Sequence, residues 1–319
     1  MFIKIFISNS KIINLSYVFF YVLISLSSVF FSLGLLDVET IWKIIFKIFT
    51  AICIFSIFSV IFYILISGLP AIFELNVINF FTGKNWDPEA GYYEILPFFL
   101  STLLSTICAV SLGAPIGILT AVFLSEFSPK YVAIILRLII KVMSGIPSII
   151  YGIFGVLVIV PTVKFISSEQ TTGDCLLSAI ILLIIMILPI IINVSEVSLR
   201  AVEDEIKEPA LALGDTKTKI IFKITIPSAK DGILNSIFLS LGRVIGETMA
   251  VMMVAGNAIN IPLPFKSVRF LTTAIALEIS YASEFHRKVL MSCGFVLFMF
   301  ILILNFIFVK IFNNKNHIN

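Results

Sequence analysis

Charged residues are scarce in this chain of 319 residues. Asp, Glu, Lys and Arg together make up 13% of it, whereas apolar residues make up 59%. Soluble globular domains contain about 25% charged residues. The composition therefore excludes an ordinary soluble fold and indicates a protein that is embedded in a membrane.

Long apolar windows are expected to be the membrane spans. A helix needs about 20 apolar residues to cross the hydrocarbon core of a bilayer, and windows of that length lie at 43–68, 98–125, 133–163, 176–198, 232–256 and 288–312. A closed β-barrel would show shorter segments in which apolar and polar residues alternate, but these windows are continuous runs. We predict an all-α, polytopic helical membrane protein with six core transmembrane helices.

A further apolar window lies at 12–36, after Lys4 and Lys11. Four interpretations of it stay open: a signal anchor, a seventh span, a helix that lies against the bundle, or a re-entrant segment. We therefore separate an N-terminal hydrophobic segment, residues 1–39, from the transmembrane domain that follows.

The transmembrane domain is assigned to residues 40–312 and is followed by a polar tail at 313–319. Lys and Arg are concentrated in the segment 199–231, between the fourth and fifth windows. Because cytoplasmic loops carry an excess of these cations, we expect that segment and the tail to face the cytoplasm.

Residues that bind metals or form disulfides are also few. The chain has two histidines, His286 and His317, and four scattered cysteines, and neither set has the spacing of a metal site or a disulfide framework. No Gly-x-x-x-x-Gly-Lys-Ser/Thr phosphate-binding loop occurs. We expect no metal, no cofactor, no nucleic-acid partner and no ATPase activity in this chain.

Helix-breaking and small residues interrupt the third window. The run KVMSGIPSIIYGIFG at 141–155 places Pro147 and Ser148 in mid-membrane. Proline removes a backbone hydrogen bond and bends a helix, which a membrane protein tolerates where a neighbour or a water-lined path satisfies the carbonyl that is left over. The run is either a packing kink or a bend that lines a pore.

The segment 69–97 is the longest predicted outer loop, because its proline and glycine residues break any periodic pattern. Two interpretations are open. It is either a surface for a partner, or a solvated connector whose Trp86, Tyr92 and Tyr93 are aromatic anchors at the membrane interface.

The segment 199–231 predicts two short helices joined by a sharp turn. Gly214 suits the left-handed conformation that follows a helix C-terminus, and Asp215 or Thr216 can cap the second helix. An exposed amphipathic face is expected from Ala210, Leu211, Leu213, Ile220, Ile221 and Phe222. Such a hairpin either lies on the membrane surface or inserts into a groove of a partner.

The spacing within this segment resembles the signature of ABC-importer permeases, which is Glu-Ala-Ala, three residues, Gly, nine residues, Ile-x-Leu-Pro. Here Glu208-Pro209-Ala210 is followed by three residues, then Gly214, then nine residues, and then Ile224-Thr225-Ile226-Pro227. The resemblance implies that the loop 203–230 docks on a separate ATPase, whose closure moves the helices as rigid bodies. The coupling residues that it implies are Glu208, Pro209, Ala210, Gly214, Ile224, Ile226 and Pro227.

Two ionisable residues stand inside the fifth window. Arg243 and Glu247 are four residues apart, so on a continuous helix they lie on one face. A charge at the bilayer centre costs at least about 2.5 kcal/mol, so such residues usually face an interior or a pathway. We expect Arg243 and Glu247 to line a translocation path together with Pro147 and Ser148. The alternative is that the pair neutralises itself or locks neighbouring helices together.

The run Gly242-Arg243-Val244-Ile245-Gly246-Glu247-Thr248-Met249-Ala250-Val251 resembles the fifth-span motif of the phosphate-specific ABC permeases, the PstC family. The run at 146–155 and Trp-Asp-Pro at 86–88 are similar to the same family, and the resemblance covers residues 40–312. It implies a type I ABC-importer permease in the bacterial cytoplasmic (inner) membrane. Its implied partners are a PstA-like second permease, two copies of a PstB-like ATPase and an extracytoplasmic phosphate-binding protein.

The cargo follows from the resemblance rather than from the residues. An arginine offers a permanent charge and a fork of donors that matches phosphate oxygens, but sulfate or molybdate fits the same chemistry. An alternative of a different class is an ion-coupled secondary transporter or channel, which needs no ATPase and carries the hairpin at 199–231 on the membrane surface.

Overall fold

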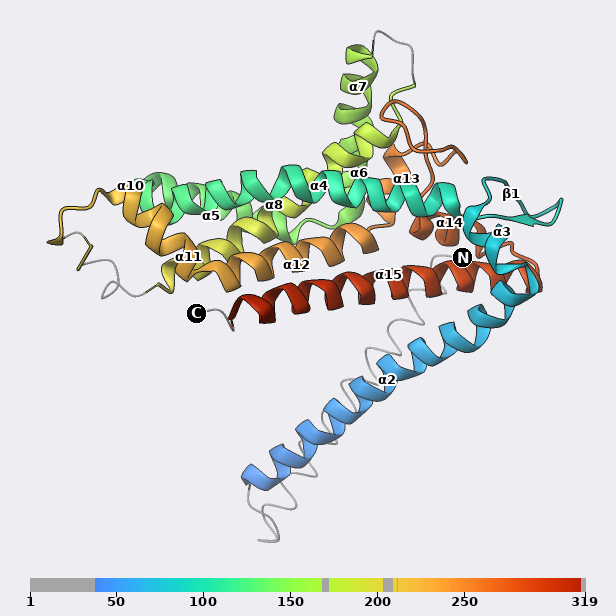
Figure 1. The fold of residues 1–319 in the computed structure, drawn as a ribbon, viewed down its shortest axis with the longest axis horizontal. Coiled ribbons are helices and arrows are strands. Elements are labelled where there is room, and N and C mark those ends of the chain that lie inside the picture. The colour runs from blue at the N-terminus through green and yellow to red at the C-terminus, as the bar shows by residue number, and fades with distance from the viewer. Residues whose placement is uncertain (1–37, 168–171, 203–208, 211, 317–319) are drawn as a thin grey trace, which may run out of the picture. The chain divides into compact units, whose positions relative to one another are not determined.

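The computed structural model describes residues 38–167, 172–202, 209–210 and 212–316, and most of them are helical (Figure 1). The predicted all-α fold is confirmed. The window at 12–36 lies outside the described residues. The chain divides into two units, Met1–Tyr63 and Ile64–Asn319.

The elements follow one another along the chain, with three π-helical segments labelled η. The first ten are α2 (Val38–Glu74), α3 (Val77–Thr82), β1 (Trp86–Asp87), β2 (Tyr92–Tyr93), α4 (Leu96–Val122), η1 (Phe123–Phe127), α5 (Lys130–Gly145), α6 (Ser148–Phe154), η2 (Gly155–Ile159) and α7 (Val160–Ile166). The others are α8 (Leu176–Arg200), α10 (Lys217–Ile220), η3 (Ile221–Thr225), α11 (Ile226–Ser228), α12 (Lys230–Gly246), α13 (Met249–Val254), α14 (Leu271–Glu278) and α15 (Glu284–Asn316).

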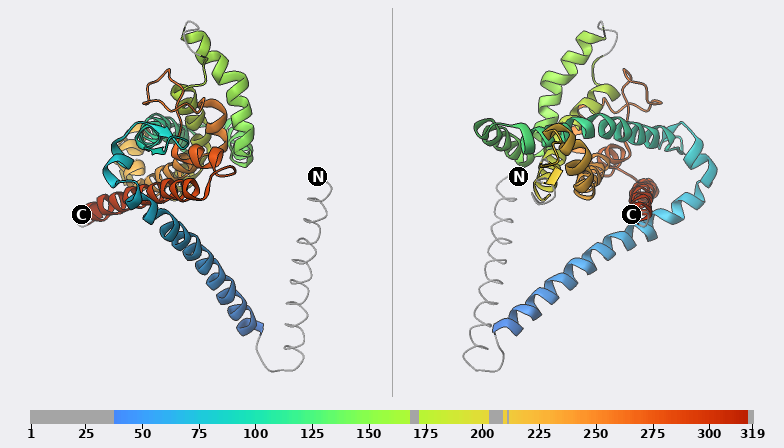
Figure 2. Two further views of the ribbon diagram at one scale, coloured as in Figure 1. Left: turned by 90° about the vertical axis from the view of Figure 1, so that its right-hand side faces the viewer. Right: turned by 60° about the vertical axis from the view of Figure 1, so that its left-hand side comes forward.

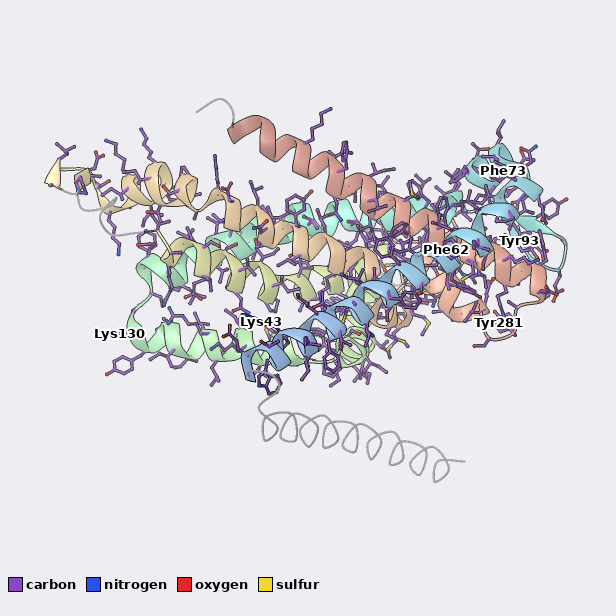
Figure 3. All side chains as sticks on the ribbon, turned by 90° about the horizontal axis from the view of Figure 1, so that it is seen from below. Lys43, Phe62, Phe73, Tyr93, Lys130 and Tyr281 are labelled. Carbon is purple, nitrogen blue, oxygen red and sulfur yellow. The ribbon has the colours of Figure 1, made fainter. Side chains whose placement is uncertain are left out.

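The described part of the first unit is the beginning of α2, and its large apolar side chains project outward (Figure 3). Phe55, Phe58 and Phe62 are 73, 67 and 64% exposed. The hydroxyls of Ser56 and Ser59 donate to carbonyls one turn earlier, at 2.9 and 2.8 Å. A helix that is apolar on its surface and satisfies its polar groups internally is suited to contact with lipid.

The second unit is organised around α8, the most buried of its apolar helices. It contacts α4, α12 and α5, and these helices run beside one another in Figures 1 and 2. Two glycines of α4 bring that helix close to α8: a Cβ atom at Gly117 would lie 2.6 Å from Cγ2 of Ile191, and one at Gly113 would lie 2.7 Å from Cδ1 of Ile187. Small residues allow such close packing of helices within a membrane.

Within the described part of the chain, five helices are long and apolar enough to cross a membrane: Trp42–Glu74, Leu96–Phe127, Ser148–Ile166, Leu176–Arg200 and Glu284–Ile307. They correspond to four predicted windows and to the second half of the window at 133–163. That window and the one at 232–256 are each divided by a short non-helical break. The sequence predicts a bend in the first of these, whereas it predicts a continuous helix for the second.

The segment 69–97 is not a solvated connector, because some of its side chains belong to a hydrophobic core. In the hairpin of β1 and β2, Trp86 lies opposite Tyr93, and the two side chains are only 4 and 7% exposed. They pack with residues of α4, α14 and α15, including Phe98 and Leu290. The interpretation of Trp86 and Tyr93 as interfacial anchors is therefore wrong, because both are core residues, whereas Tyr92 is exposed. We call this end of the second unit the hairpin end, and the end that carries 199–231 the coupling end.

Candidate translocation and coupling site

The first break separates α5 from α6 at Ile146-Pro147. A residue before proline is disfavoured in a helix, and Ile146 adopts φ −71° and ψ 127°. Because Pro147 has no N–H, the carbonyl of Met143, four residues earlier, loses its usual helical donor. The hydroxyl of Tyr151 replaces that donor at 2.8 Å, beside a longer contact from the N–H of Ile146 at 3.3 Å.

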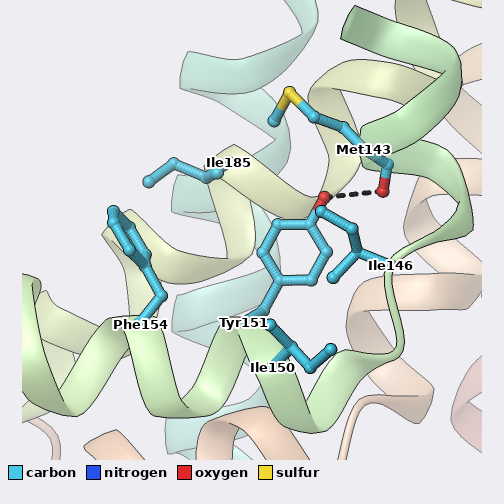
Figure 4. A pocket seen from close by; sticks show the side chains of 6 residues that line it. All are labelled: Met143, Ile146, Ile150, Tyr151, Phe154 and Ile185. Atoms are coloured by element: carbon cyan, nitrogen blue, oxygen red, sulfur yellow. Dashed lines mark hydrogen bonds between the residues drawn. The ribbon is translucent and has the colours of Figure 1, made fainter.

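A cavity of about 260 Å³ opens beside this break (Figure 4). Its lining comes from α5, from the break, from α6 and from α8, and consists of Met143, Ile146, Ile150, Tyr151, Phe154 and Ile185. Pro147 and Ser148, the expected path residues, are not part of this lining. Pro147 creates the break. Tyr151 lines the cavity beside it, and the sequence pattern did not single out this residue.

The second break separates α12 from α13. Glu247 follows the last helical residue, Gly246, with φ −71° and ψ 127°, so Arg243 and Glu247 do not share one helical face as predicted. Oε1 of Glu247 accepts a hydrogen bond from the N–H of Ala250 at 3.2 Å, and the Glu247 carbonyl accepts one from Thr272 at 3.0 Å. The buried carboxylate therefore caps the first turn of α13.

Arg243 lies in the last turn of α12 and is exposed. Among the described residues, its guanidinium forms no ion pair with Glu247 or with any other carboxylate. A Cβ atom at Gly242 or Gly246 would meet nothing within 4 Å, which shows that Arg243 stands on an open face of the chain.

The half-helices that follow the two breaks pack against each other through small residues. A Cβ atom at Gly152 of α6 would lie 3.1 Å from the Cα atom of Ala250 in α13, and one at Gly155 would lie 2.5 Å from Cγ1 of Val254. The two breaks are therefore neighbours in space, although about 100 residues separate them in the chain. Of the four expected path residues, Pro147 and Ser148 stand at one break, and Arg243 and Glu247 at the other.

The coupling segment has the turn that its sequence predicts. Glu208 lies outside the described residues. Gly214 has φ 87°, which is the left-handed conformation expected of it, and the N–H groups of Leu213 and Asp215 donate to the carbonyls of Pro209 and Ala210. The side chain of Thr216 caps α10 by accepting from the N–H of Lys219 at 3.4 Å.

One face of the coupling segment is buried against the helix ends. Ile220 and Ile221 are 4 and 1% exposed, whereas Leu213 and Phe222 are 88 and 52% exposed. Placing both isoleucines on the exposed face was therefore wrong. Ile221 belongs to a core cluster in which Ala121, Leu124, Ala133, Leu199 and Ile233 take part, and Ile226 packs against it. Ile224 is half-buried and Pro227 exposed, so the segment has an inner face on the bundle and an outer face that is open.

The comparison with known protein families agrees with this geometry. Residues 113–317 match the model of the binding-protein-dependent transport system inner membrane component. The chain belongs to this family. The predicted ABC-importer permease fold is confirmed. The helix bundle, the two breaks and the coupling segment all belong to this one chain.

Curated relatives and solved structures are consistent with this assignment. The permease is 34% identical over 239 residues to the probable ABC transporter permease protein YqgH of Bacillus subtilis, covering 72% of this chain and 77% of the relative. It is 31% identical over 245 residues to the phosphate transport system permease protein PstC of Xylella fastidiosa, covering 71 and 76%. A chain from inward-facing structures of the MetNI methionine ABC transporter has a TM-score of 0.51 at 22% identity and covers 66% of this chain and 91% of that one.

At the hairpin end, the permease has a polar cluster that no local motif indicates. The carboxylate of Glu278 accepts from Nε1 of Trp86 at 2.9 Å, contacts Nε2 of His286 at 2.9 Å, and forms an ion pair with Arg269. Nε of Arg269 donates to the carbonyl of Asn257 at 2.9 Å. The cluster thereby joins the hairpin, α14, α15 and the segment before α14. Burial and then the charge of Glu278 raise the pKa of the nearby Tyr93 phenol, which stays protonated at physiological pH.

We predict that Tyr151→Phe destabilises the permease by about 1 kcal/mol, because the Met143 carbonyl loses its stronger donor at the break. The measurement is the thermal unfolding midpoint of the purified protein in detergent. Tyr131→Phe is the matched control, since Tyr131 is 83% exposed at the start of α5. This variant should unfold like the wild type. Equal midpoints for Tyr151→Phe and Tyr131→Phe would contradict this account of the break.

Proposed function

We propose that this permease is the membrane subunit of an ATP-driven importer that carries inorganic phosphate across the bacterial cytoplasmic membrane. Several curated relatives are named phosphate transport system permease protein PstC, among them one from Pasteurella multocida that is 31% identical over 271 residues. The observation that carries the proposal is Arg243, an exposed cation that stands at a helix break within an apolar chain.

The chemistry of Arg243 supports an oxyanion as cargo. A charge within the bilayer is costly unless it faces an interior or an aqueous path, and the nearest acid along the chain, Glu247, is committed to the N–H of Ala250. The guanidinium is therefore available for a ligand. Its planar fork can donate two parallel hydrogen bonds to phosphate oxygens. The open face around it, at Gly242 and Gly246, leaves room for the path to be completed by a second permease.

The coupling segment supports the connection to an ATPase. Leu213 is 88% exposed at the turn that Gly214 forms, and an exposed apolar side chain at a sharp turn suits insertion into a groove of a partner. We propose that the loop 203–230 docks on the ATPase, with Glu208, Pro209, Ala210, Gly214, Ile224, Ile226 and Pro227 as its coupling residues. The complex would contain a PstA-like permease, two copies of a PstB-like ATPase and an extracytoplasmic phosphate-binding protein.

In this proposal, transport proceeds by movement of packed helices rather than by chemistry in the permease. Closure of the two ATPases displaces the coupling segments, and the core cluster around Ile221 and Leu199 passes that displacement to the helix ends as a rigid-body motion. The breaks at Pro147 and Glu247 are where the helices can change direction. Cargo then passes Arg243 when the breaks rearrange.

We predict that Gly214→Arg abolishes ATP-dependent phosphate uptake by the reconstituted complex. A side chain at φ 87° is strained by about 1–2 kcal/mol, and the arginine would also enlarge a turn that must fit a groove. Gly214→Asn is the control, because asparagine tolerates the left-handed conformation and is small; it should retain uptake. The measurement is accumulation of labelled phosphate in proteoliposomes, with assembly checked by co-purification. Normal uptake by an assembled Gly214→Arg complex would refute the coupling role.

We predict that Arg243→Gln lowers phosphate uptake about tenfold or more at normal assembly, because a charge-assisted hydrogen bond to the cargo, worth about 1.5–3 kcal/mol, is lost. Arg243→Lys keeps the charge without the fork and should fall between Arg243→Gln and the wild type. Uptake is measured with phosphate alone and against excess sulfate or molybdate. If Arg243→Gln transports like the wild type, the guanidinium is not part of the path; if sulfate or molybdate competes fully, the cargo is not specifically phosphate.

A further inference from the structure

A buried carboxylate near the coupling end links α8 to α5 and, through an arginine, to η1. Glu196 lies in the last turns of α8 and is 6% exposed. Its Oε1 accepts a hydrogen bond from Nε of Arg137 on α5 at 2.7 Å. The same oxygen forms an ion pair with Arg200, one turn further along α8, whose Nε lies 3.1 Å away. Nη2 of Arg137 also donates to the carbonyl of Leu124 in η1 at 3.2 Å. Arg137 therefore ties α5 to both α8 and η1.

The helix α5 has little else that fixes it to the bundle. Only Ala133 and Ile140 are buried along it, while large apolar side chains such as Tyr131, Ile134 and Leu138 are 83, 60 and 62% exposed. Helices within a membrane are held together by close packing and by interhelical hydrogen bonds. With so few packed side chains, α5 depends on its polar contacts to an unusual degree.

A second polar contact lies nearer the break. Nδ2 of Asn193 on α8 donates to Oγ of Ser144 at 3.1 Å, one residue before Gly145, where α5 ends. The two contacts, Arg137 with Glu196 and Ser144 with Asn193, thus align α5 with α8 from the coupling end up to the first break.

The same end of α8 receives the coupling segment. Ile221 packs into the core cluster with Leu199 of α8, with Val202 just after that helix, and with Leu124 of η1. Lys217 of α10 donates to the carbonyl of Glu126 in η1, and its ammonium group lies 5.5 Å from the ring centroid of Phe127. A displacement of the coupling segment therefore reaches η1 and the end of α8, which are the two elements that Arg137 holds.

We propose that Glu196, acting through Arg137, is the positioning residue that makes α5 follow the coupling segment, so that closure of the ATPases is delivered to the break at Gly145–Pro147. This inference rests on the proposed importer function. Arg200 shares the same carboxylate oxygen but belongs to α8 itself and is half-exposed, so it neutralises charge without linking two elements.

The test compares phosphate imported with ATP hydrolysed by the complete complex in proteoliposomes. Arg137→Gln and Glu196→Gln are expected to lower the number of phosphates imported per ATP about fivefold or more, a typical size for the loss of an energetic coupling, while ATP hydrolysis continues. Arg200→Gln removes the other arginine from the same oxygen and should keep the wild-type ratio. If all three variants reduce import and hydrolysis by one common factor, or if Arg200→Gln uncouples as strongly as Arg137→Gln, the inference is wrong.

A second readout does not depend on the identity of the cargo. Gly145→Cys places a thiol at the end of α5, where a Cβ atom meets nothing within 4 Å, and its rate of reaction with a water-soluble maleimide is measured in nucleotide-free and ATP-bound complexes. We expect the rate to depend on ATP, and the dependence to be lost with Arg137→Gln and kept with Arg200→Gln. A dependence that survives Arg137→Gln, or that is absent from the start, overturns the inference. A wild-type complex that imports no phosphate yet shows this pattern would instead contradict the proposed cargo.

Discussion

A membrane offers the backbone no water, so every N–H and carbonyl within it must find a partner in the protein. The two helix breaks satisfy this constraint with side chains. At the first break, Tyr151 donates to the Met143 carbonyl, which lacks its usual helical donor because Pro147 has no N–H. At the second, the Glu247 carboxylate accepts from an N–H in the first turn of α13, and Thr272 donates to the Glu247 carbonyl. Tyr151 and Glu247 belong to the segments that flank their own breaks, whereas Thr272 comes from α14, so the second break also depends on a neighbouring helix. The half-helices after the two breaks pack against each other through Gly152 and Gly155.

Function follows from how these parts are connected. The coupling segment buries one face against the ends of α4, α5, α8 and α12 and leaves the turn at Gly214 open. We propose that the helices carry movement of this segment toward the two adjacent breaks, one with a cavity beside Tyr151 and one with the exposed Arg243. The polar cluster at Glu278 joins the elements of the opposite end. In this proposal one end receives the motion, the breaks rearrange, and the buried charges hold the other end.

The sequence predicted the features that depend on neighbours along the chain. The apolar windows predicted most of the spans, Pro147 predicted the first break, and Gly214 with Thr216 predicted the turn and its cap. The second break was not predicted, because Gly246-Glu247-Thr248 lies in an apolar run that reads as one helix. The contacts of Glu278 with Trp86 and of Glu196 with Arg137 join residues 192 and 59 positions apart, and no local pattern fixes such pairs. Ile220 and Ile221 were misplaced for the same reason: only the bundle decides which face of an amphipathic segment is covered.

If Arg137 and Glu196 link these helices as proposed, ATPase closure moves α5 together with α8 and changes its direction relative to α7 at the first break. Pairs of spin labels at exposed positions test this most directly: Tyr131 with Val197 for α5 and α8, and Tyr131 with Phe165 for α5 and α7, which are 83, 69 and 83% exposed. Between nucleotide-free and ATP-bound complexes, the first distance should stay constant within about 2 Å, the scale of small helix shifts, while the second changes by more. If the distance between Tyr131 and Val197 changes while the distance between Tyr131 and Phe165 stays constant, α5 does not follow α8.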